Sequence, residues 1–203
     1  MKVLMHICCG PCLIYPLRTL RDEGIYVDGF FYNPNIQPYT EFKRRLECLE
    51  EFAKLQKLKL ASEVGYDIEE FFRRVVWHED ERCASCYEMR LRKTAQAAKD
   101  SGYDAFTTTL LFSKYQKHGL IVQIADVIAK ELKIKFLYRD FREGWQEGQE
   151  LSRKTGMYRQ KYCGCIYSEK ERYLKRLDIK RTGGEHGTDG GDTEEAGDKK
   201  IPA

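Results

Sequence analysis

Seven of the eight cysteines in this chain stand in three short groups. The first group is Cys8, Cys9 and Cys12 in CCGPC, the second is Cys83 and Cys86 in CASC, and the third is Cys163 and Cys165 in CGC. Cysteine thiolates act as nucleophiles, as redox groups and as ligands for soft metals. Since random placement would not produce this grouping, the pattern predicts that thiolate chemistry is the function of the chain.

Two of the groups have the spacing of metal ligands. A C-x-x-C pair presents two sulfurs to one metal, and a helix that begins there directs backbone N–H groups toward the thiolates. Two such pairs that meet in space make a four-thiolate site, which fits either a structural zinc ion or an iron–sulfur cluster. The adjacent Cys8 and Cys9 favour the cluster, because vicinal ligands suit it better than they suit a single tetrahedral ion.

Other roles for the sulfurs remain open. CCGPC alone is also typical of a thioredoxin-like reactive dithiol, but that interpretation leaves CASC unexplained. Cys163 and Cys165 could close a strained, easily reduced disulfide or bind a second metal ion. Cys48, in RRLECLEEF, is predicted to be a core thiol, and His6 is predicted to be a hydrogen-bonded core histidine.

Polar and aromatic residues gather in the loops YNPNIQP, FTTTLLFSKYQKHG, DFREGWQ and GMYRQKYCGCIYS. Loops of this kind often carry function. Residues that could stack on a splayed nucleotide or hydrogen-bond to it are Asn33, Asn35, Tyr39, Tyr115, Arg142, Tyr158, Arg159 and Gln160. Basic residues that could meet phosphates are Arg44, Arg45, Arg90, Arg92, Lys114 and Lys117.

The elements that must position these residues alternate along the chain. Strands are predicted at 3–7, 26–32, 59–63, 104–107 and 135–138, and helices at 12–23, 38–56, 68–76, 83–101, 119–132, 144–154 and 167–177. This alternation predicts an α/β fold in which helices cover both faces of a mainly parallel sheet.

Several candidate residues directly follow predicted strands. In such sheets, ligands bind beyond the carboxyl ends of the strands. Cys8 and Cys9 follow the first strand, Asn33 and Asn35 the second, Thr108 and Thr109 a later one, and Asp140 the last. We therefore expect these residues to meet at one edge of the sheet.

Length and composition limit the number of domains and the location. A chain of 203 residues with 42% hydrophobic content can form one domain with a core, which we place at 1–181. Residues 182–203 are rich in glycine and acidic side chains and are predicted to be a disordered tail. We find no apolar run of the roughly 18 residues of a membrane span and no export signal, so we expect a cytoplasmic protein without membrane contacts. Without residues 183–203, which hold six acidic and two basic residues, the net charge rises from +3 to +7, and this surplus modestly favours an anionic partner.

Six motifs, taken in order, resemble those of one enzyme family. HICCGPC, YNPNIQP, RCASCYEMRL, FTTTLLFSKYQ, DFR and YRQKYCGCIYS are similar to the motifs of the cobalamin-independent epoxyqueuosine reductases of the QueH type. The resemblance covers residues 1–181, and six motifs in register make it specific. Gln37 and Lys114 depart from the family pattern, which would have histidine and proline there, and neither departure removes a sulfur.

The resemblance implies a HUP-like, Rossmann-like single domain and the last step of queuosine synthesis. In that step the epoxide of epoxyqueuosine at the tRNA wobble position is reduced to an alkene. The resemblance also implies a [4Fe-4S] cluster held by Cys8, Cys9, Cys83 and Cys86, with Cys163 and Cys165 as a redox-active pair or as ligands of a second metal ion, iron. Cys12 is a further candidate metal ligand.

The implied reaction takes two electrons and two protons and releases water. A cluster supplies electrons singly, so an electron donor is implied, and a nearby dithiol or iron could hold the second electron or polarise the oxygen. Asp140 or Tyr162 could donate a proton. Two rival functions are a zinc-stabilised RNA-binding module without catalysis and a cluster-dependent tRNA thiolase, for which the sequence offers no SGGxDS-type phosphate loop.

Overall fold

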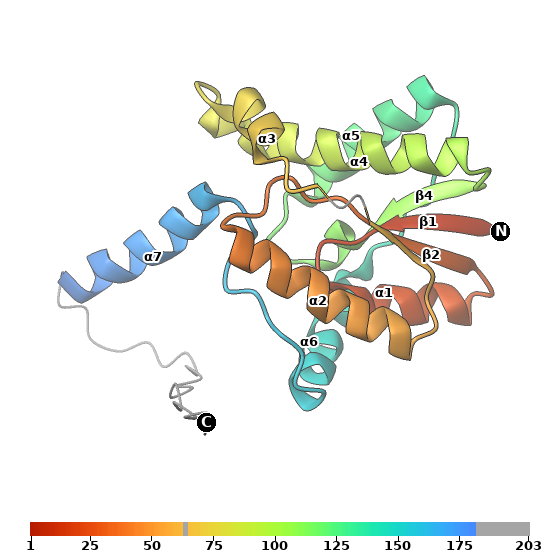
Figure 1. Ribbon diagram of the computed structural model, residues 1–203, viewed down its shortest axis with the longest axis horizontal. Helices are drawn as coiled ribbons and strands as arrows, with labels where there is room; N and C mark the ends of the chain where they lie inside the picture. Colours follow the sequence, from red (N-terminus) through yellow and green to blue (C-terminus); the bar gives the residue numbers. More distant parts are fainter. Residues whose placement is uncertain (63–64, 182–203) are drawn as a thin grey trace, which may run out of the picture.

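The computed structural model describes residues 1–62 and 65–181, with the backbone alone for residues 175–181. The tail predicted at 182–203 lies outside the described residues. The remainder forms one α/β domain, drawn in Figure 1. Among the described residues, no helix has both the length and the apolar character needed to cross a membrane.

Five parallel strands form the central sheet, in the order β3-β2-β1-β4-β5. Their bounds are β1 Lys2–His6, β2 Tyr26–Phe31, β3 Leu60–Ser62, β4 Ala105–Thr108 and β5 Lys135–Phe136. In the middle strand, Val3 and Met5 are buried on one face, and Leu4 and His6 on the other. Burial on both faces is what a parallel sheet covered by helices requires.

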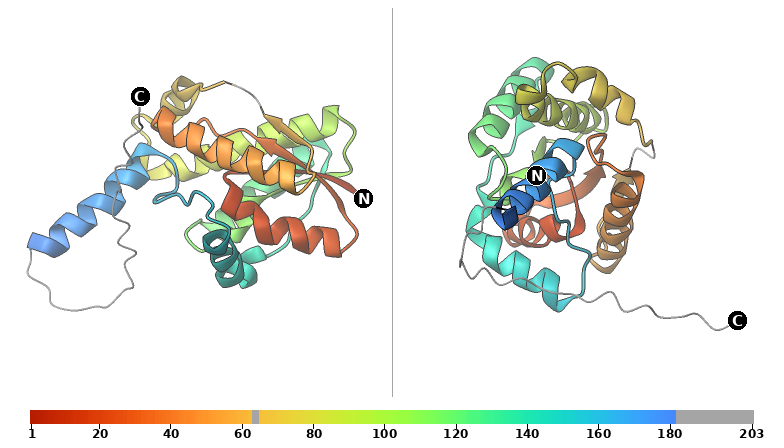
Figure 2. Two further views of the ribbon diagram at one scale, coloured as in Figure 1. Left: turned by 60° about the horizontal axis from the view of Figure 1, so that its bottom comes forward. Right: turned by 90° about the vertical axis from the view of Figure 1, so that its left-hand side faces the viewer.

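Seven α-helices surround this sheet in the described part of the chain. Their bounds are α1 Gly10–Asp22, α2 Tyr39–Leu55, α3 Ile68–Val75, α4 Arg82–Asp100, α5 His118–Leu132, α6 Trp145–Lys154 and α7 Ile166–Arg181. Figure 1 shows α1, α2 and α6 on one side of the sheet and α3, α4 and α5 on the other. Figure 1 and the left view of Figure 2 show that α7 projects from the body at the end where the strands finish.

The direction of the strand order reverses at β1. From β1 the chain passes through α1 and α2 to β2 and β3, and it then returns through α3 and α4 to β4, on the other side of β1. Such a reversal leaves a crevice beyond the carboxyl ends of the two middle strands, where ligands bind. The segments that follow β1 and β4 meet there, because the Cys8 backbone N–H donates to Thr109 Oγ1 at 3.2 Å.

The predicted helices and strands are all present, but some ends differ. α1 begins at Gly10 rather than at residue 12, because Cys9 is extended (φ −172, ψ 162) and Pro11 suits the first helical turn. The structure also contains three single-turn 3-10 helices that were not predicted, η1 Glu79–Glu81, η2 Thr109–Phe112 and η3 Phe141–Gly144. A single turn is too short to show a hydrophobic period.

Candidate functional site

The first cysteine group follows β1 and begins α1. The Sγ atoms of Cys8, Cys9 and Cys12 all lie within 4.8 Å of one another, and all three residues are buried. Cys9 is the N-cap of α1, and its extended backbone leads directly into the helix that carries Cys12. The local fold therefore brings three sulfurs together at the N-terminus of a helix, where backbone N–H groups favour thiolates.

The three thiols do not share one ionisation behaviour. The pKa of Cys8 lies well below its usual range, chiefly because the Cys12 and Cys9 thiols hydrogen-bond to its sulfur. Burial raises the pKa of Cys9, and the hydrogen bond to Cys8 raises that of Cys12. Gln160 Nε2 donates to Cys9 Sγ at 3.1 Å and to Cys12 Sγ at 3.5 Å. The group thus favours a thiolate at Cys8, stabilised by neighbouring donors.

The second group lies in the first turn and a half of α4. Cys86 is buried in a small apolar cluster with Phe71, Val75, Met89 and Cys165. Burial raises the pKa of Cys86 to about 12. Cys83 is partly buried and packs against the main core.

Arg90 is the polar partner of Cys86. Its Nη2 donates to Cys86 Sγ at 2.9 Å, and its Nε donates to the Cys86 backbone oxygen at 2.9 Å. The second sulfur group therefore already carries a charged hydrogen-bond donor at one of its two sulfurs.

The third group stands in the loop before α7. Cys163 is exposed, and Gln116 Nε2 donates to its Sγ at 3.1 Å, while Cys165 is buried. Burial of its sulfur raises the pKa of Cys163 even though the residue as a whole is exposed. Gln116 is itself held by the Tyr87 hydroxyl, which donates to its Oε1 at 2.7 Å. Cys163 and Cys165 are both free thiols.

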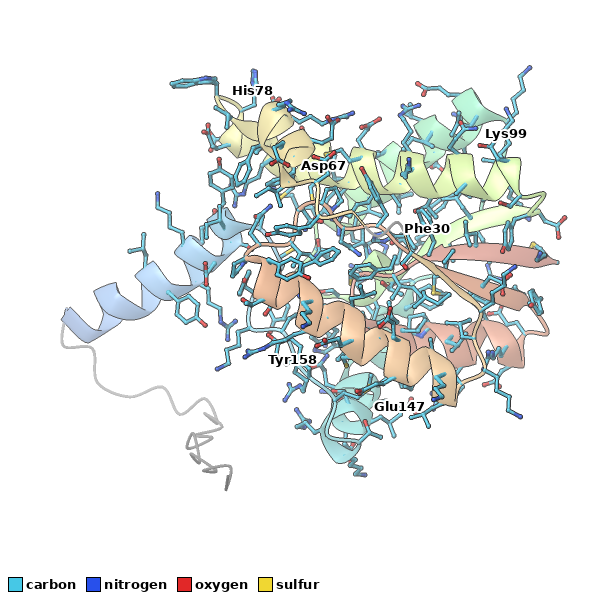
Figure 3. All side chains as sticks on the ribbon, viewed as in Figure 1. Phe30, Asp67, His78, Lys99, Glu147 and Tyr158 are labelled. Carbon is cyan, nitrogen blue, oxygen red and sulfur yellow. The ribbon has the colours of Figure 1, made fainter. Side chains whose placement is uncertain are left out.

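A buried ion pair on α2 holds the C-x-C loop in place. Arg45 is 1% exposed, and its Nε donates to Glu41 Oε1 at 2.7 Å. Its two terminal nitrogens donate to the backbone oxygens of Cys163 and Tyr162 at 2.9 and 3.0 Å. The Tyr158 hydroxyl also donates to Glu41, and Figure 3 shows Tyr158 beside α2. We name these residues, Glu41, Arg45 and Tyr158, the α2 clamp.

A cavity of about 980 Å³ connects the first and third sulfur groups. Among its lining residues are Cys8, Cys12, Cys163 and Arg90. The other lining residues are Pro11, Leu110, Ser113, Tyr115, Gln116, Trp145, Gln146, Gln149, Glu150, Arg153, Arg159, Gln160, Lys161, Tyr162, Ser168 and Arg172. The cavity is therefore lined by thiols, by several basic side chains and by aromatic rings, of which Tyr115 is exposed.

The predicted site residues divide into those that line this cavity and those that do not. The lining includes Cys8, Cys12, Tyr115, Arg159, Gln160, Tyr162 and Cys163. Outside the lining are Cys9, Asn33, Asn35, Cys83, Cys86, Asp140, Arg142, Tyr158 and Cys165. Asn33 and Asn35 are buried, and neither Nδ2 nor Oδ1 of the Asn35 side chain has a hydrogen-bond partner. Asn35 Nδ2 would lie 3.0 Å from a Cβ added to Gly164, so this amide faces the C-x-C loop.

Asp140 is poorly suited to the proton-donor role predicted for it. It caps η3, where its Oδ1 accepts hydrogen bonds from the Arg142 backbone N–H at 3.1 Å and from Arg142 Nε at 2.8 Å. Hydrogen bonding to Arg142 lowers the pKa of Asp140 to about 2. A carboxyl that is ionised at neutral pH has no proton to give, and Arg142 is occupied by the same ion pair.

The predicted phosphate contacts also need correction. Arg45 and Arg90 are each 1% exposed, so neither can meet a phosphate at the surface. Arg92 forms ion pairs with Glu88 and Glu131, which neutralise its charge. The other three basic residues, Arg44, Lys114 and Lys117, are exposed, as a phosphate contact requires.

The predictions for Cys48 and His6 are confirmed. Cys48 is a buried free thiol on α2. His6 is fully buried, and its ring nitrogens lie 3.0 Å from Thr108 Oγ1 and 3.2 Å from the Tyr32 backbone oxygen. Burial, assisted by the charge of Arg90, lowers the pKa of His6 to about 3, so this histidine is neutral.

Sequence analysis did not single out several residues of the cavity. Gln116 hydrogen-bonds to Cys163, and Trp145 packs edge-on against Tyr115 with ring centroids 5.7 Å apart. Arg153 and Arg172 add positive charge to the lining. Gln116 and Trp145 stand within the motifs FTTTLLFSKYQKHG and DFREGWQ, so their position in those loops was the available signal.

The donor set fits a metal that prefers sulfur. Three buried sulfurs within 4.8 Å of one another, with nitrogen donors directed at them, match the soft ligands chosen by zinc and iron–sulfur centres. Among the described residues, the sulfurs within 4.8 Å of one another are those of Cys8, Cys9 and Cys12, and the structure does not bring Cys83 and Cys86 into this group. Arg90 lines the cavity and donates to Cys86. The residues present therefore fit a thiolate-ligated metal or cluster.

Comparison with known proteins gives consistent matches over most of the chain. A family model described as "Epoxyqueuosine reductase QueH" matches residues 3–171. A curated protein of that name from Dehalococcoides mccartyi is 37% identical over 174 residues, which is 86% of this chain and 96% of the relative. Another from Thermotoga maritima is 36% identical over 191 residues, which is 90% of this chain and 97% of the relative.

Comparison with solved structures supports the fold. A crystal structure described as a predicted subunit of tRNA methyltransferase from Methanocaldococcus jannaschii has a TM-score of 0.53 with this chain. It is 13% identical, and the match covers 90% of this chain and 88% of the other. At that identity, the likeness concerns the arrangement of strands and helices alone.

Proposed function

Because the chain belongs to the epoxyqueuosine reductase QueH family, we propose that it reduces the epoxide of epoxyqueuosine in tRNA to the alkene of queuosine. The observation that carries this proposal is the cavity itself. The cavity lies between the buried group of Cys8, Cys9 and Cys12 and the C-x-C loop, and basic and aromatic side chains line it. The family name implies a tRNA substrate, and the modified base of that substrate lies at the wobble position.

The cofactor we propose is a [4Fe-4S] cluster held by Cys8, Cys9, Cys83 and Cys86. Cys12 supports the same centre, since its sulfur lies within 4.8 Å of those of Cys8 and Cys9. Four thiolates are the usual ligand set of such clusters. When bound, the cluster supplies electrons one at a time.

Cys163 and Cys165 are proposed as the redox-active pair or as ligands of a second iron ion. Cys163 lines the cavity, whereas Cys165 packs with Cys86, so the loop reaches from the substrate space to the second sulfur group. Gln116 directs an N–H at Cys163 Sγ and would stabilise its thiolate. The physiological electron donor is a further implied partner.

We propose Tyr162 as a proton donor. It lines the cavity, and burial raises the pKa of its phenol, so the hydroxyl keeps its proton at neutral pH. That hydroxyl donates to the backbone oxygen of Gln37, so it must leave this partner before it can give its proton to the substrate. The epoxide oxygen leaves as water after it takes up two electrons and two protons, and a protonated phenol in the cavity can supply one of those protons.

The rim of the cavity fits a nucleic acid. Arg153, Arg159, Lys161 and Arg172 outnumber the one acidic residue of the lining, Glu150, and would attract phosphates. Tyr115 is 84% exposed and meets Trp145, so the two rings offer a surface on which an unstacked base can rest. Asn33, Asn35, Arg142, Tyr158 and Gln160 are the further substrate-binding candidates that the family motifs supply.

The experiment that tests this function uses Cys163→Ser and Cys165→Ser. Each variant should abolish conversion of epoxyqueuosine to queuosine in tRNA digests when a chemical reductant is supplied. Each should keep the visible spectrum of the cluster, because neither residue belongs to the proposed ligand set. Robust conversion by either variant would contradict the role proposed for this pair.

Colour separates this proposal from a zinc-stabilised RNA-binding module. Purified without oxygen, a cluster protein is brown and loses its broad absorbance on reduction, whereas a zinc protein is colourless. A colourless protein that contains stoichiometric zinc and binds tRNA without converting it would favour the module instead.

A further inference from the structure

Arg90 is a buried cation that has no carboxylate partner within the described residues. It lies on α4 and is 1% exposed. Both hydrogen bonds of its side chain go to Cys86, one to the sulfur and one to the backbone oxygen. Moving a charge out of water is costly unless an opposite charge accompanies it. The other buried arginine, Arg45, meets this requirement with Glu41, but Arg90 does not.

The groups that face Arg90 are sulfurs. Its Nη2 lies 2.9 Å from Cys86 Sγ, and the guanidinium lines the cavity together with Cys8 and Cys163. A guanidinium keeps its charge in proteins, and the sulfurs around Arg90 belong to three different cysteine groups.

The other two buried bases beside the sulfurs bring no uncompensated charge. His6 is neutral because its pKa is about 3, and the charge of Arg45 is balanced by Glu41. The Arg90 Cζ lies over the Tyr87 ring, 5.7 Å from its centroid, and this contact also holds the guanidinium in place. Arg90 is thus a rigid positive charge held against the sulfurs.

We propose that Arg90 is the counter-charge that sets the reduction potential of the metal centre held by Cys8, Cys9, Cys83 and Cys86. The inference rests on the cofactor in the proposed function. When the centre accepts one electron from the donor, its net charge becomes more negative by one. A fixed cation and an N–H···S hydrogen bond stabilise that reduced form more than the oxidised form, so they raise the potential. Arg90 is a positioning residue and breaks no bond.

The test is a redox titration of the loaded protein, in which electron paramagnetic resonance measures the fraction of reduced centre at each potential. Arg90→Gln removes the charge but keeps an N–H donor, and Arg90→Lys keeps the charge but loses the planar fork. Arg92→Gln is the matched control, since it removes a positive charge two residues along the same helix, where Glu88 and Glu131 neutralise it. Iron and sulfide are measured for every sample, so that potentials are compared at equal loading.

For Arg90→Gln we expect the reduction potential to fall by at least about 59 mV. For a one-electron couple, this is a tenfold fall in the ratio of reduced to oxidised centre, measured at the midpoint potential of the wild-type protein. Arg90→Lys should show a smaller fall, and Arg92→Gln none. A fully loaded Arg90→Gln protein with the wild-type midpoint would overturn the proposal. If neither Arg90 variant takes up iron, Arg90 assembles the site rather than setting its potential, and the proposal is again wrong. Failure of the proposed cofactor is distinct, because the wild-type protein itself would then show no iron–sulfur signal.

Discussion

Gly164 separates the two cysteines of the C-x-C loop, and its replacement by alanine tests how that loop is held. Its φ of +144 is a conformation that side chains rarely adopt. An added Cβ would lie 3.0 Å from Asn35 Nδ2, 3.1 Å from Ile36 Cγ1 and 3.4 Å from Arg45 Nη1. The Gly164 backbone oxygen also accepts a hydrogen bond from the Gln37 N–H at 2.9 Å. The loop therefore has no room to rotate away without losing contacts.

Two effects add in Gly164→Ala. Backbone strain at such a φ costs about 1 to 3 kcal/mol. The crowded neighbours must also move by a few tenths of an ångström, and overpacking of this kind adds about 1 kcal/mol or more. We expect the free energy of unfolding to fall by about 2 to 4 kcal/mol, and conversion of epoxyqueuosine to fall sharply because Cys163 and Cys165 are displaced.

Gly156→Ala is the matched control. Gly156 also has a positive φ, +66, but nothing lies within 4 Å of its added Cβ. The free energy of unfolding of the Gly156→Ala protein should fall by about 1 kcal/mol, because the new side chain strains the backbone but meets no neighbour. Its activity should not change. The assays are anaerobic urea unfolding of the loaded protein and conversion of the modified tRNA. Equal losses in the two variants, or full conversion by Gly164→Ala, would refute this reasoning.

Three further substitutions test single residues of the site. Cys83→Ser should lose iron and colour, and a variant that keeps both in full would show that Cys83 is not a ligand. Arg45→Met should lower the free energy of unfolding by about 3 to 5 kcal/mol, because it leaves the buried Glu41 carboxylate without its ion-pair partner. The control Arg44→Met, at an exposed position, should change the free energy of unfolding little. Equal urea midpoints for the two variants would contradict the role of the α2 clamp. Asp140→Asn should keep most of the conversion activity, because a carboxyl that is ionised at neutral pH has no proton to donate. Loss of activity in a variant with an intact cluster would reverse that conclusion.

The position of the first sulfur group could be predicted from the sequence because it depends on a strand end. Cys8 and Cys9 directly follow an apolar strand, and parallel strands bring the segments after them to one edge of the sheet. The same rule predicted that Thr109 would lie close to Cys8, and a hydrogen bond joins the two. The burial of Cys48 and His6 could be predicted from their apolar neighbours in the sequence.

The buried arginines could not be predicted from residue type, because arginine is mostly a surface residue. Arg45 and Arg90 each stand four residues after their partner on the same helix, Glu41 and Cys86, and both lie on the buried face. The helical spacing was therefore visible in the sequence, but the partner of Arg90 is a sulfur, which an ion-pair pattern does not include. The role of Asp140 as a helix cap depends on a single 3-10 turn with no sequence period.

The most direct test of the account compares one preparation of the protein with and without its metal centre. The protein is reconstituted anaerobically with iron and sulfide, reduced, and mixed in slight excess with tRNA that carries epoxyqueuosine. A second portion is treated identically after the metal has been removed by chelation. Nucleosides from both tRNA samples are then analysed by mass spectrometry. We expect queuosine to appear with the loaded protein alone. Equal conversion in the two portions, or none with a fully loaded protein, would contradict a reaction that depends on the metal centre.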